Sequence, residues 1–173
     1  EEVKLEEEKL EIKERAIEPV REIEYVSQII IDYGISLDDA VKAGDYEDVN
    51  PHIANADFPE NKNEQGKREV TFKLFAFDKE TESEEAVQEM DKENYRPATF
   101  RELMAFGEAN PEVQRYFPIN ALGTVVNHPK NNVPAVFELW SYTGKRRVSY
   151  NDSVRKWDRY CRFLGVLKEK NNS

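Results

Sequence analysis

The sequence predicts an α+β fold: an antiparallel sheet in the C-terminal half, two or three helices, and an acidic helical extension at the N-terminus. Three patterns predict this class, namely a capping box at Thr99 and Glu102, an alternating apolar strand over 69–77, and a tight turn at Thr143-Gly144-Lys145. The 173 residues suffice for one hydrophobic core. We therefore expect a single α+β domain over residues 25–173, preceded by an extension over residues 1–24.

The N-terminal extension is rich in charge. Residues 1–24 contain ten Glu against five Lys or Arg, and their apolar residues recur at helical spacing. Pro19 interrupts or restarts this helix. We expect the Glu-rich face to be solvated, with a coiled-coil partner helix as the alternative.

The next segment predicts a strand, a short helix and a long loop. Residues 25–33 contain a β-branched run closed by Gly34, which is typical of a buried strand. Ser36 then caps a helix over 37–43, which ends at Gly44. Residues 45–67 are rich in Asn, Asp and Pro and read as a loop. Its apolar residues are expected to hold it to the body, namely Val49, Ile53 and Phe58.

The middle of the chain predicts a central strand followed by two helices. Residues 69–77 alternate in polarity and form the strand. Ser83 begins a helix that reaches Lys92 and carries acidic residues in its first turn. Thr99 begins the next helix, which reaches about Ala109, and a further helical turn covers 112–117.

The C-terminal third predicts the rest of the sheet. Strands are expected at 119–126, 135–142, 146–150 and 160–167. The turn at Thr143-Gly144-Lys145 joins the second and third of these strands as a hairpin. We expect the last strand to close the sheet.

Several kinds of chemistry lack their residue patterns. The glycines are scattered singly, which excludes a phosphate-binding loop, and the lone Cys161 allows no internal disulfide. His52 and His128 have no metal-ligand spacing. We therefore predict no catalytic residue, metal site or cofactor, and favour a protein that is not an enzyme. Two alternatives stay open: a hydrolase using His128 with a nearby acid, and a weak cation site at residues 45–50.

Charge and hydropathy constrain the partners. The net charge is −10, yet residues 141–173 carry nine basic and three acidic residues with aromatics between them. That segment either meets nucleic acid or an acidic partner, or packs beside the acidic half of the chain. No apolar run is long enough to span a membrane, so we expect no membrane association. The cytoplasm is the default location, with a removed leader left open.

The basic, aromatic C-terminal segment supplies the candidate ligand-binding residues, namely Trp140, Tyr142, Arg146, Arg147 and Trp157. Because alternate residues of a strand share a face, Arg146 and Arg147 are expected to point in opposite directions. The predicted function is a binding module that presents a ligand- or protein-recognition surface from its C-terminal sheet. A nucleic-acid-associated factor is the alternative. The identity of the ligand and the oligomeric state stay open.

Two motifs carry a family resemblance. Tyr95-Arg96-Pro97-Ala98-Thr99, followed by Glu102-Leu103, resembles the opening motif of C-type-lectin-like and formylglycine-generating-enzyme-like domains. Residues 159–166 are similar to their closing strand. The whole chain also looks like an uncharacterised bacterial family with Tyr-Arg-Pro-Ala-Thr…Glu-Leu and Ala-Leu-Gly…Arg-Phe-Leu motifs.

The lectin-like resemblance covers about residues 85–168 and implies a hairpin-rich scaffold that displays a binding surface. The sugar-binding triplets of that family and its Trp-Asn-Asp calcium motif are absent here. A single cysteine cannot supply the paired cysteines of the oxidase-type members. The resemblance therefore implies neither calcium-dependent sugar binding nor oxidase chemistry.

Overall fold

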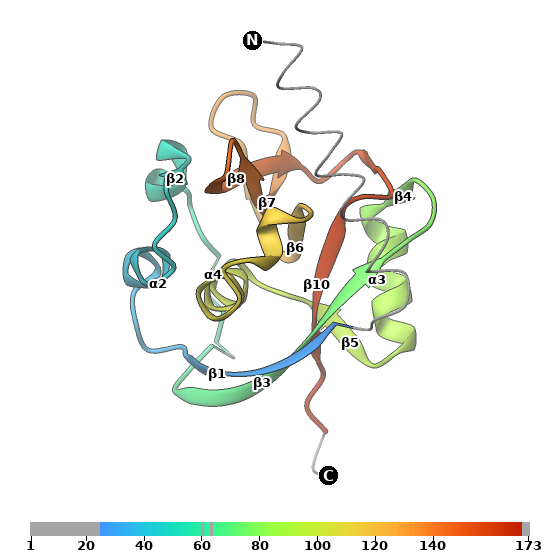
Figure 1. The fold of residues 1–173 in the computed structure, drawn as a ribbon, viewed down its shortest axis with the longest axis horizontal. Helices are drawn as coiled ribbons and strands as arrows, with labels where there is room; N and C mark the ends of the chain where they lie inside the picture. Colours follow the sequence, from blue (N-terminus) through green and yellow to red (C-terminus); the bar gives the residue numbers. More distant parts are fainter. Residues whose placement is uncertain (1–24, 60, 63, 171–173) are drawn as a thin grey trace.

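The computed structural model describes residues 25–59, 61–62 and 64–170, so the extension predicted at residues 1–24 lies outside the described residues. Figure 1 shows a large sheet with helices packed against it. The strands are β1 (Val26–Asp32), β2 (Asp48–Val49), β3 (Lys67–Ala76), β4 (Thr81–Glu82), β5 (Tyr95–Pro97), β6 (Ile119–Asn127), β7 (Pro134–Tyr142), β8 (Lys145–Asp152), β9 (Lys156–Trp157) and β10 (Arg162–Leu167). The helices are α2 (Leu37–Ala43), α3 (Ser83–Lys92) and α4 (Phe100–Ala109), with short 3-10 helices η1 (Pro51–Asn55) and η2 (Val113–Arg115).

The large sheet is mixed and draws strands from both halves of the chain. Within the described residues, eight strands form it in the order β1, β3, β10, β6, β7, β8, β2, with β5 pairing to β10. β10 runs antiparallel to β3 but parallel to β6, and β2 runs parallel to β8. The combination of helices with a large sheet is confirmed. The expected antiparallel pairing of C-terminal strands holds for β6, β7 and β8, but the sheet also includes β1, β2 and β3 and two parallel pairs. The helices do not all lie in the C-terminal half.

The correction has a topological cause. The predicted final strand exists, but it inserts between β3 and β6 instead of following β8 at an edge. The chain therefore returns across the sheet after β8, and β10 runs in the same direction as β6. Parallel strands need such a long connection across the sheet, because a tight hairpin can join only antiparallel strands.

Helices α4 and α3 cover opposite faces of the sheet. On one face, Phe100, Leu103 and Phe106 of α4 belong to the larger hydrophobic cluster, which includes apolar residues of β3, β6 and β7. On the other face, Ala86 and Met90 of α3 belong to a smaller cluster with residues of β9 and β10. Because successive side chains of a strand point to opposite faces, the same strands contribute residues to both clusters, as expected for a sheet that is buried on two faces.

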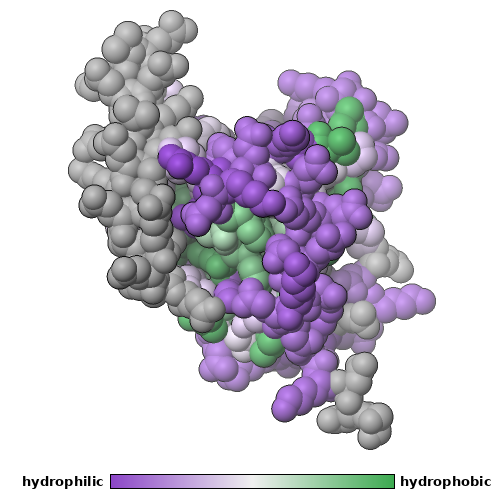
Figure 2. Space-filling model, turned by 90° about the vertical axis from the view of Figure 1, so that its right-hand side faces the viewer, coloured by the Kyte–Doolittle hydropathy of each residue, from purple (hydrophilic) through white to green (hydrophobic). Residues whose placement is uncertain are grey.

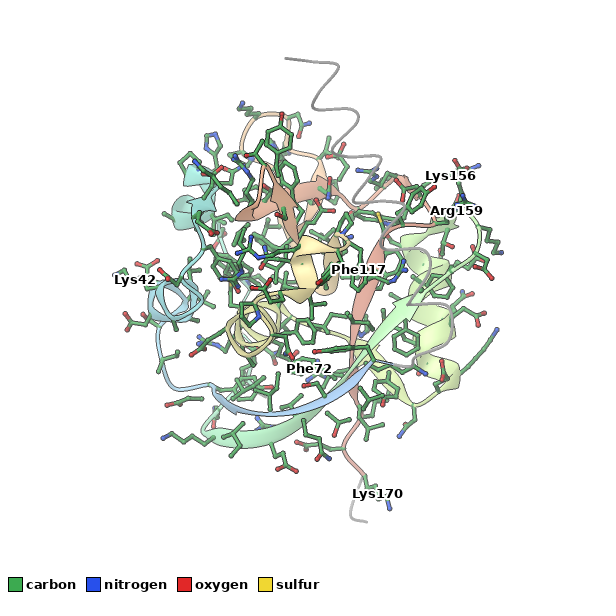
Figure 3. The ribbon with its side chains drawn as sticks, viewed as in Figure 1. Lys42, Phe72, Phe117, Lys156, Arg159 and Lys170 are labelled. Carbon is green, nitrogen blue, oxygen red and sulfur yellow. The ribbon has the colours of Figure 1, made fainter. Side chains whose placement is uncertain are left out.

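Figure 3 shows the resulting separation of apolar and charged side chains. Phe72 of β3 lies in the interior beside α4, and it is fully buried. Lys42, Lys156 and Lys170 lie at the periphery. On the side of the molecule where α3 lies, hydrophilic side chains surround an apolar hollow (Figure 2).

Several predicted elements are confirmed in detail. The Ser36 hydroxyl accepts a hydrogen bond from the Asp39 backbone N–H and caps α2. The helix predicted over Ser83–Lys92 has the same bounds in the structure. β7 and β8 are joined by a two-residue turn in which Thr143 and Gly144 have φ values of 51° and 73°. Positive φ at both positions is the backbone geometry that matches the twist of a hairpin.

The N-terminal strand and the long loop differ in part from expectation. β1 was expected to be buried, but it lies at an edge of the sheet, and the side chain of Ile30 is 70 % exposed. The loop predicted over 45–67 contains β2 and η1. Its apolar residues do hold it to the body, because Ile53 is buried and both Val49 and Phe58 pack against the larger cluster.

Candidate functional site

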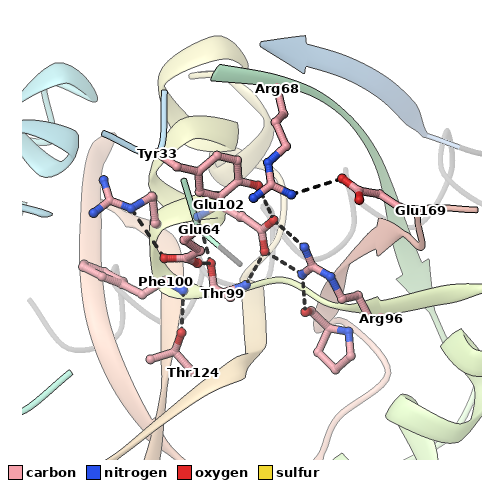
Figure 4. A network of polar contacts seen from close by, with 11 residues as sticks. Tyr33, Glu64, Arg68, Arg96, Thr99, Phe100, Glu102, Thr124 and Glu169 are labelled. Atoms are coloured by element: carbon pink, nitrogen blue, oxygen red, sulfur yellow. Dashed lines mark hydrogen bonds and ion pairs between the residues drawn. The ribbon is translucent and has the colours of Figure 1, made fainter. Parts of the chain in front are cut away.

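A buried polar network surrounds the start of α4 (Figure 4). The Glu102 backbone N–H lies 3.4 Å from the Thr99 hydroxyl, and the Thr99 N–H donates to a Glu102 carboxylate oxygen at 2.9 Å. The predicted capping box is therefore present. Arg96 donates two hydrogen bonds to the same carboxylate at 2.7 and 2.8 Å, and the Tyr33 hydroxyl donates a third at 2.7 Å.

These contacts keep the Glu102 carboxylate ionised although its side chain is 0 % exposed. Burial raises the pKa of Glu102, but the hydrogen bonds and charge of Arg96, with Tyr33 and the Thr99 N–H, outweigh it. The net result is a pKa below the ordinary value for glutamate. Every strong donor around this carboxylate is already used within the fold, so Glu102 is a structural residue.

A cavity of about 190 Å³ lies beside this network, lined by the start of α4, by β6 and by the loop before β3. The Thr99 hydroxyl donates to a Glu64 carboxylate oxygen at 2.5 Å, and the Arg101 Nε lies 3.5 Å from the other oxygen. Phe58 forms one wall and stacks on Phe100 with ring centroids 4.9 Å apart. The charged groups of this cavity therefore compensate each other.

The hairpin of β7 and β8 carries an aromatic and guanidinium cluster on the sheet face opposite α4. The Arg147 guanidinium lies 5.7 Å from the Trp140 ring centroid and 5.4 Å from the Tyr142 ring centroid. Trp140 Nε1 donates to the Ser149 hydroxyl at 2.9 Å, and Arg147 also forms an ion pair with Asp48. Both rings are half-buried.

Two other predicted binding residues lie away from this cluster. Arg146 points to the α4 side of the sheet, where its guanidinium donates to the Gly44 carbonyl at 2.6 Å and the Gly107 carbonyl at 2.8 Å. Trp157 is 0 % exposed, and its Nε1 donates to the Ser83 hydroxyl at 2.9 Å. Of the five candidates, the structure therefore brings together Trp140, Tyr142 and Arg147, and it places Arg146 and Trp157 in the interior.

A polar pair continues the same face toward the centre of the sheet. Asn120 of β6 and Glu138 of β7 are cross-strand neighbours, and Glu138 precedes Trp140 by two residues on the same face. Asn120 is 0 % exposed, and its amide lies close enough to the Glu138 carboxyl to favour the ionised form of that group, although neither amide atom makes a hydrogen bond of good geometry. A buried amide normally loses stability unless it is hydrogen-bonded, so Glu138 is the natural partner of Asn120.

Glu138 is the titratable group of this face. Burial raises the pKa of Glu138 to about 7, although Asn151, Arg155 and Asn120 each favour its ionised form. The carboxyl therefore exchanges its proton near neutral pH and can act as a donor or as an acceptor. We call Asn120, Glu138, Trp140, Tyr142 and Arg147 together the recognition face.

The remaining candidate chemical groups are engaged in local structure. His128 accepts a hydrogen bond at Nδ1 from the Lys130 backbone N–H at 3.1 Å. Burial raises the pKa of the Cys161 thiol to about 12, which disfavours the thiolate. In the acidic segment considered for a cation, Glu47 accepts the Arg146 backbone N–H at 2.6 Å. Among the described residues, no group of three His, Cys, Asp or Glu side chains could hold a metal ion.

Two residues of the recognition face are not among the binding residues predicted from the sequence. Asn120 and Glu138 each stand as a polar residue with an apolar residue on either side in the strand, which is the signal that could have found them. Their proximity depends on the register that pairs Asn120 with Glu138 across β6 and β7. A hydrophobic pattern does not determine that register when residues of both faces are buried.

Comparisons with known proteins give no relative: no family model, no curated protein and no solved structure matches this chain. Among the helices of the described residues, none has the length and apolar character needed to cross a membrane.

Proposed function

We propose that this chain is a non-enzymatic binding module whose ligand surface is the recognition face on β6, β7 and β8. The observation that supports this function is the guanidinium of Arg147 beside the half-buried rings of Trp140 and Tyr142. Aromatic and arginine side chains are enriched where proteins bind partners, because they combine large contact area with specific polar contacts.

The composition of the face favours a ligand with a flat side and a polar edge. Trp140 offers ring surface for stacking, and Arg147 adds a planar cation beside it. Below the rings, the partly buried Glu138 carboxyl supplies a polar group, and the buried Asn120 lies directly across from it. A heteroaromatic molecule, or a planar side chain of a partner protein, satisfies both requirements.

The C-type-lectin-like architecture stays part of this proposal. Two features are consistent with it: the capping box that follows the Tyr-Arg-Pro-Ala-Thr motif, and a final segment that pairs as a strand inside the sheet. A relationship to the C-type-lectin-like fold has to be compatible with the two parallel strand pairs of this sheet, β10 with β6 and β2 with β8.

Protein NMR with ¹⁵N labelling tests the ligand surface. The two indole N–H groups provide a probe and a control in one spectrum, because Trp140 belongs to the recognition face and Trp157 is buried. We expect some members of a panel of heteroaromatic fragments to shift the Trp140 indole signal and leave the Trp157 signal in place. Arg147→Ala should abolish those shifts, whereas Arg159→Ala, at an exposed arginine elsewhere, should preserve them.

If no fragment moves the Trp140 signal, or if Arg147→Ala leaves the shifts unchanged, this function is refuted. A short single-stranded oligonucleotide, added at low salt where phosphate contacts are strongest, tests the nucleic-acid alternative in the same spectra. That alternative has fewer basic groups to use than the sequence suggests. Arg146 donates to backbone carbonyls, and Lys168 pairs with Asp91.

A further inference from the structure

β1 presents an edge whose backbone groups point away from the sheet. The Leu74 N–H donates to the Tyr25 carbonyl at 3.1 Å, and the Tyr33 N–H donates to the Gly66 carbonyl at 2.8 Å. With the register between β1 and β3, this places the odd-numbered residues of β1 in hydrogen-bonded pairs with β3. The N–H and C=O groups of Val26, Gln28 and Ile30 therefore point outward, and they have no strand partner among the described residues.

The side chains at these three positions are exposed as well. Val26 is 49 % exposed and Ile30 is 70 % exposed, whereas Ile31, on the α4 side, is buried. Natural edge strands usually carry a lysine, a proline or a bulge that discourages pairing with another chain. Residues 26–31 contain none of these residues, and their pairing with β3 runs without a register shift.

We propose that β1 is the interface between two copies of this chain, paired antiparallel about a twofold axis at Gln28. In this register Val26 of one copy lies opposite Ile30 of the second copy, and Gln28 lies opposite Gln28 of the second copy. Each exposed apolar side chain meets an apolar neighbour, and the two central amides can hydrogen-bond across the axis. The two sheets then form one continuous sheet.

Other registers are less complementary. An axis at Ser27 places Val26 opposite Gln28 of the second copy, and an axis at Ile29 places Gln28 opposite Ile30 of the second copy. Each of these pairs an apolar side chain with a polar one. The axis at Gln28 is the arrangement that matches apolar with apolar and amide with amide, so the edge is complementary to itself. This interface is independent of the recognition face, which lies on β6, β7 and β8.

The mass of the full chain in solution, measured by light scattering over a range of concentrations, tests the interface. We expect a monomer–dimer equilibrium with a Kd of the order of micromolar, as for a small interface. Because each substitution occurs twice in the dimer, Ile30→Lys should weaken it roughly tenfold or more. Gln28→Pro should also weaken it, since it removes an outward N–H and spares the ladder with β3.

Val154→Lys is the matched control, because it makes the same kind of change at a valine that is 77 % exposed elsewhere. It should leave the dimer intact, and circular dichroism should show that all three variants remain folded. A chain that stays monomeric at its highest soluble concentration overturns the interface. So does a dimer that Ile30→Lys and Gln28→Pro leave unchanged.

Cross-linking tests the register. Val26→Cys copies mixed with Ile30→Cys copies should form a disulfide between chains, since opposed residues of a hydrogen-bonded pair lie about 5.5 Å apart at Cα. Either variant alone should cross-link far more slowly, because its two cysteines lie four residues out of register. Cys161 is buried and contributes little background. A mixture that cross-links no faster than each variant alone overturns the proposed pairing.

Discussion

Glu102 joins three parts of the chain through one buried carboxylate. It receives hydrogen bonds from Arg96, from Tyr33 and from the Thr99 backbone, which belong to β5, to the turn after β1 and to the start of α4. A buried carboxylate is stable only when such donors compensate for its lost hydration. This one residue therefore positions α4 against the sheet.

Replacing Glu102 with Gln should destabilise the protein by about 2–3 kcal/mol, because the change removes the charge that Arg96 faces and weakens the helix cap. The free energy of unfolding in urea measures the effect. Glu108→Gln, at an exposed glutamate of the same helix, is the control and should change stability little. A loss at Glu102 no larger than at Glu108 would show that the network contributes nothing to stability.

Glu138 should make stability fall as the pH rises from about 4.5 to about 7. The pKa of Glu138 is raised to about 7 in the folded protein, so in this range the folded state holds a proton that the unfolded state has released. The free energy of unfolding therefore decreases with pH in this window and is constant above it as far as this group is concerned. The total decrease is about 3 kcal/mol.

Glu102 contributes in the opposite direction at lower pH, so the measurement is the difference between unfolding curves of the parent and of Glu138→Gln. As the pH rises to 7, the parent should lose stability relative to Glu138→Gln. The difference in the free energy of unfolding should therefore be smallest at acid pH. Glu80→Gln, at an exposed glutamate, should give no such trend. A pH-independent difference for Glu138→Gln would contradict the raised pKa.

For single residues, the sequence predicts contacts between residues that are close together along the chain. The reciprocal bonds of Thr99 and Glu102 follow from a spacing of three residues, and the structure confirms them. The contribution of Tyr33 does not follow, because it lies 69 positions away along the chain. The opposite orientations of Arg146 and Arg147 follow from strand alternation, whereas the burial of Trp157 depends on its pairing with β4.

Among the elements, β6 makes an unusually close approach to the link between β5 and α4. The Gly123 N–H donates to the Ala98 carbonyl at 2.8 Å, and a Cβ at Gly123 would lie 2.5 Å from that oxygen and 2.6 Å from the Pro97 carbonyl oxygen. Both of these atoms belong to the backbone. Only glycine therefore allows β6 to pack against this link.

Gly123→Ala should lower the free energy of unfolding by about 2–3 kcal/mol, since the backbone of two elements must move apart. Gly144→Ala is the comparison: its Cβ would meet open space, but its positive φ makes alanine strained by about 1 kcal/mol. Chemical denaturation of both variants measures the difference. Equal losses at the two positions would refute the close approach of β6.

Most of the helices and longer strands could be predicted from the sequence, but the strands that pair with one another could not. Ser83–Lys92 and the hairpin turn follow from capping, charge and turn residues that lie within a few positions of each other. β2, β4, β5 and β9 have two or three residues each, too few to produce a periodic pattern. They are strands because other segments supply their hydrogen bonds.

For the whole molecule, the decisive feature is the position of β10. By lying between β3 and β6, it links the first strands of the described chain to the hairpin of β7 and β8 in one sheet. It also carries apolar residues into both hydrophobic clusters, with Leu164 in the larger and Phe163 in the smaller. The two hydrophobic clusters therefore lie on opposite sides of this one strand.

The proposed function requires that Trp140 on the recognition face is reached by solvent while Trp157 lies in the core. Acrylamide quenching of tryptophan fluorescence measures this difference in Trp157→Phe and Trp140→Phe variants, which each retain one indole. We expect Trp140 to be quenched more strongly than Trp157, because Trp140 is partly exposed and Trp157 is fully buried. Equal quenching of the two indoles would show that Trp140 is as shielded as Trp157 and would rule out this recognition face.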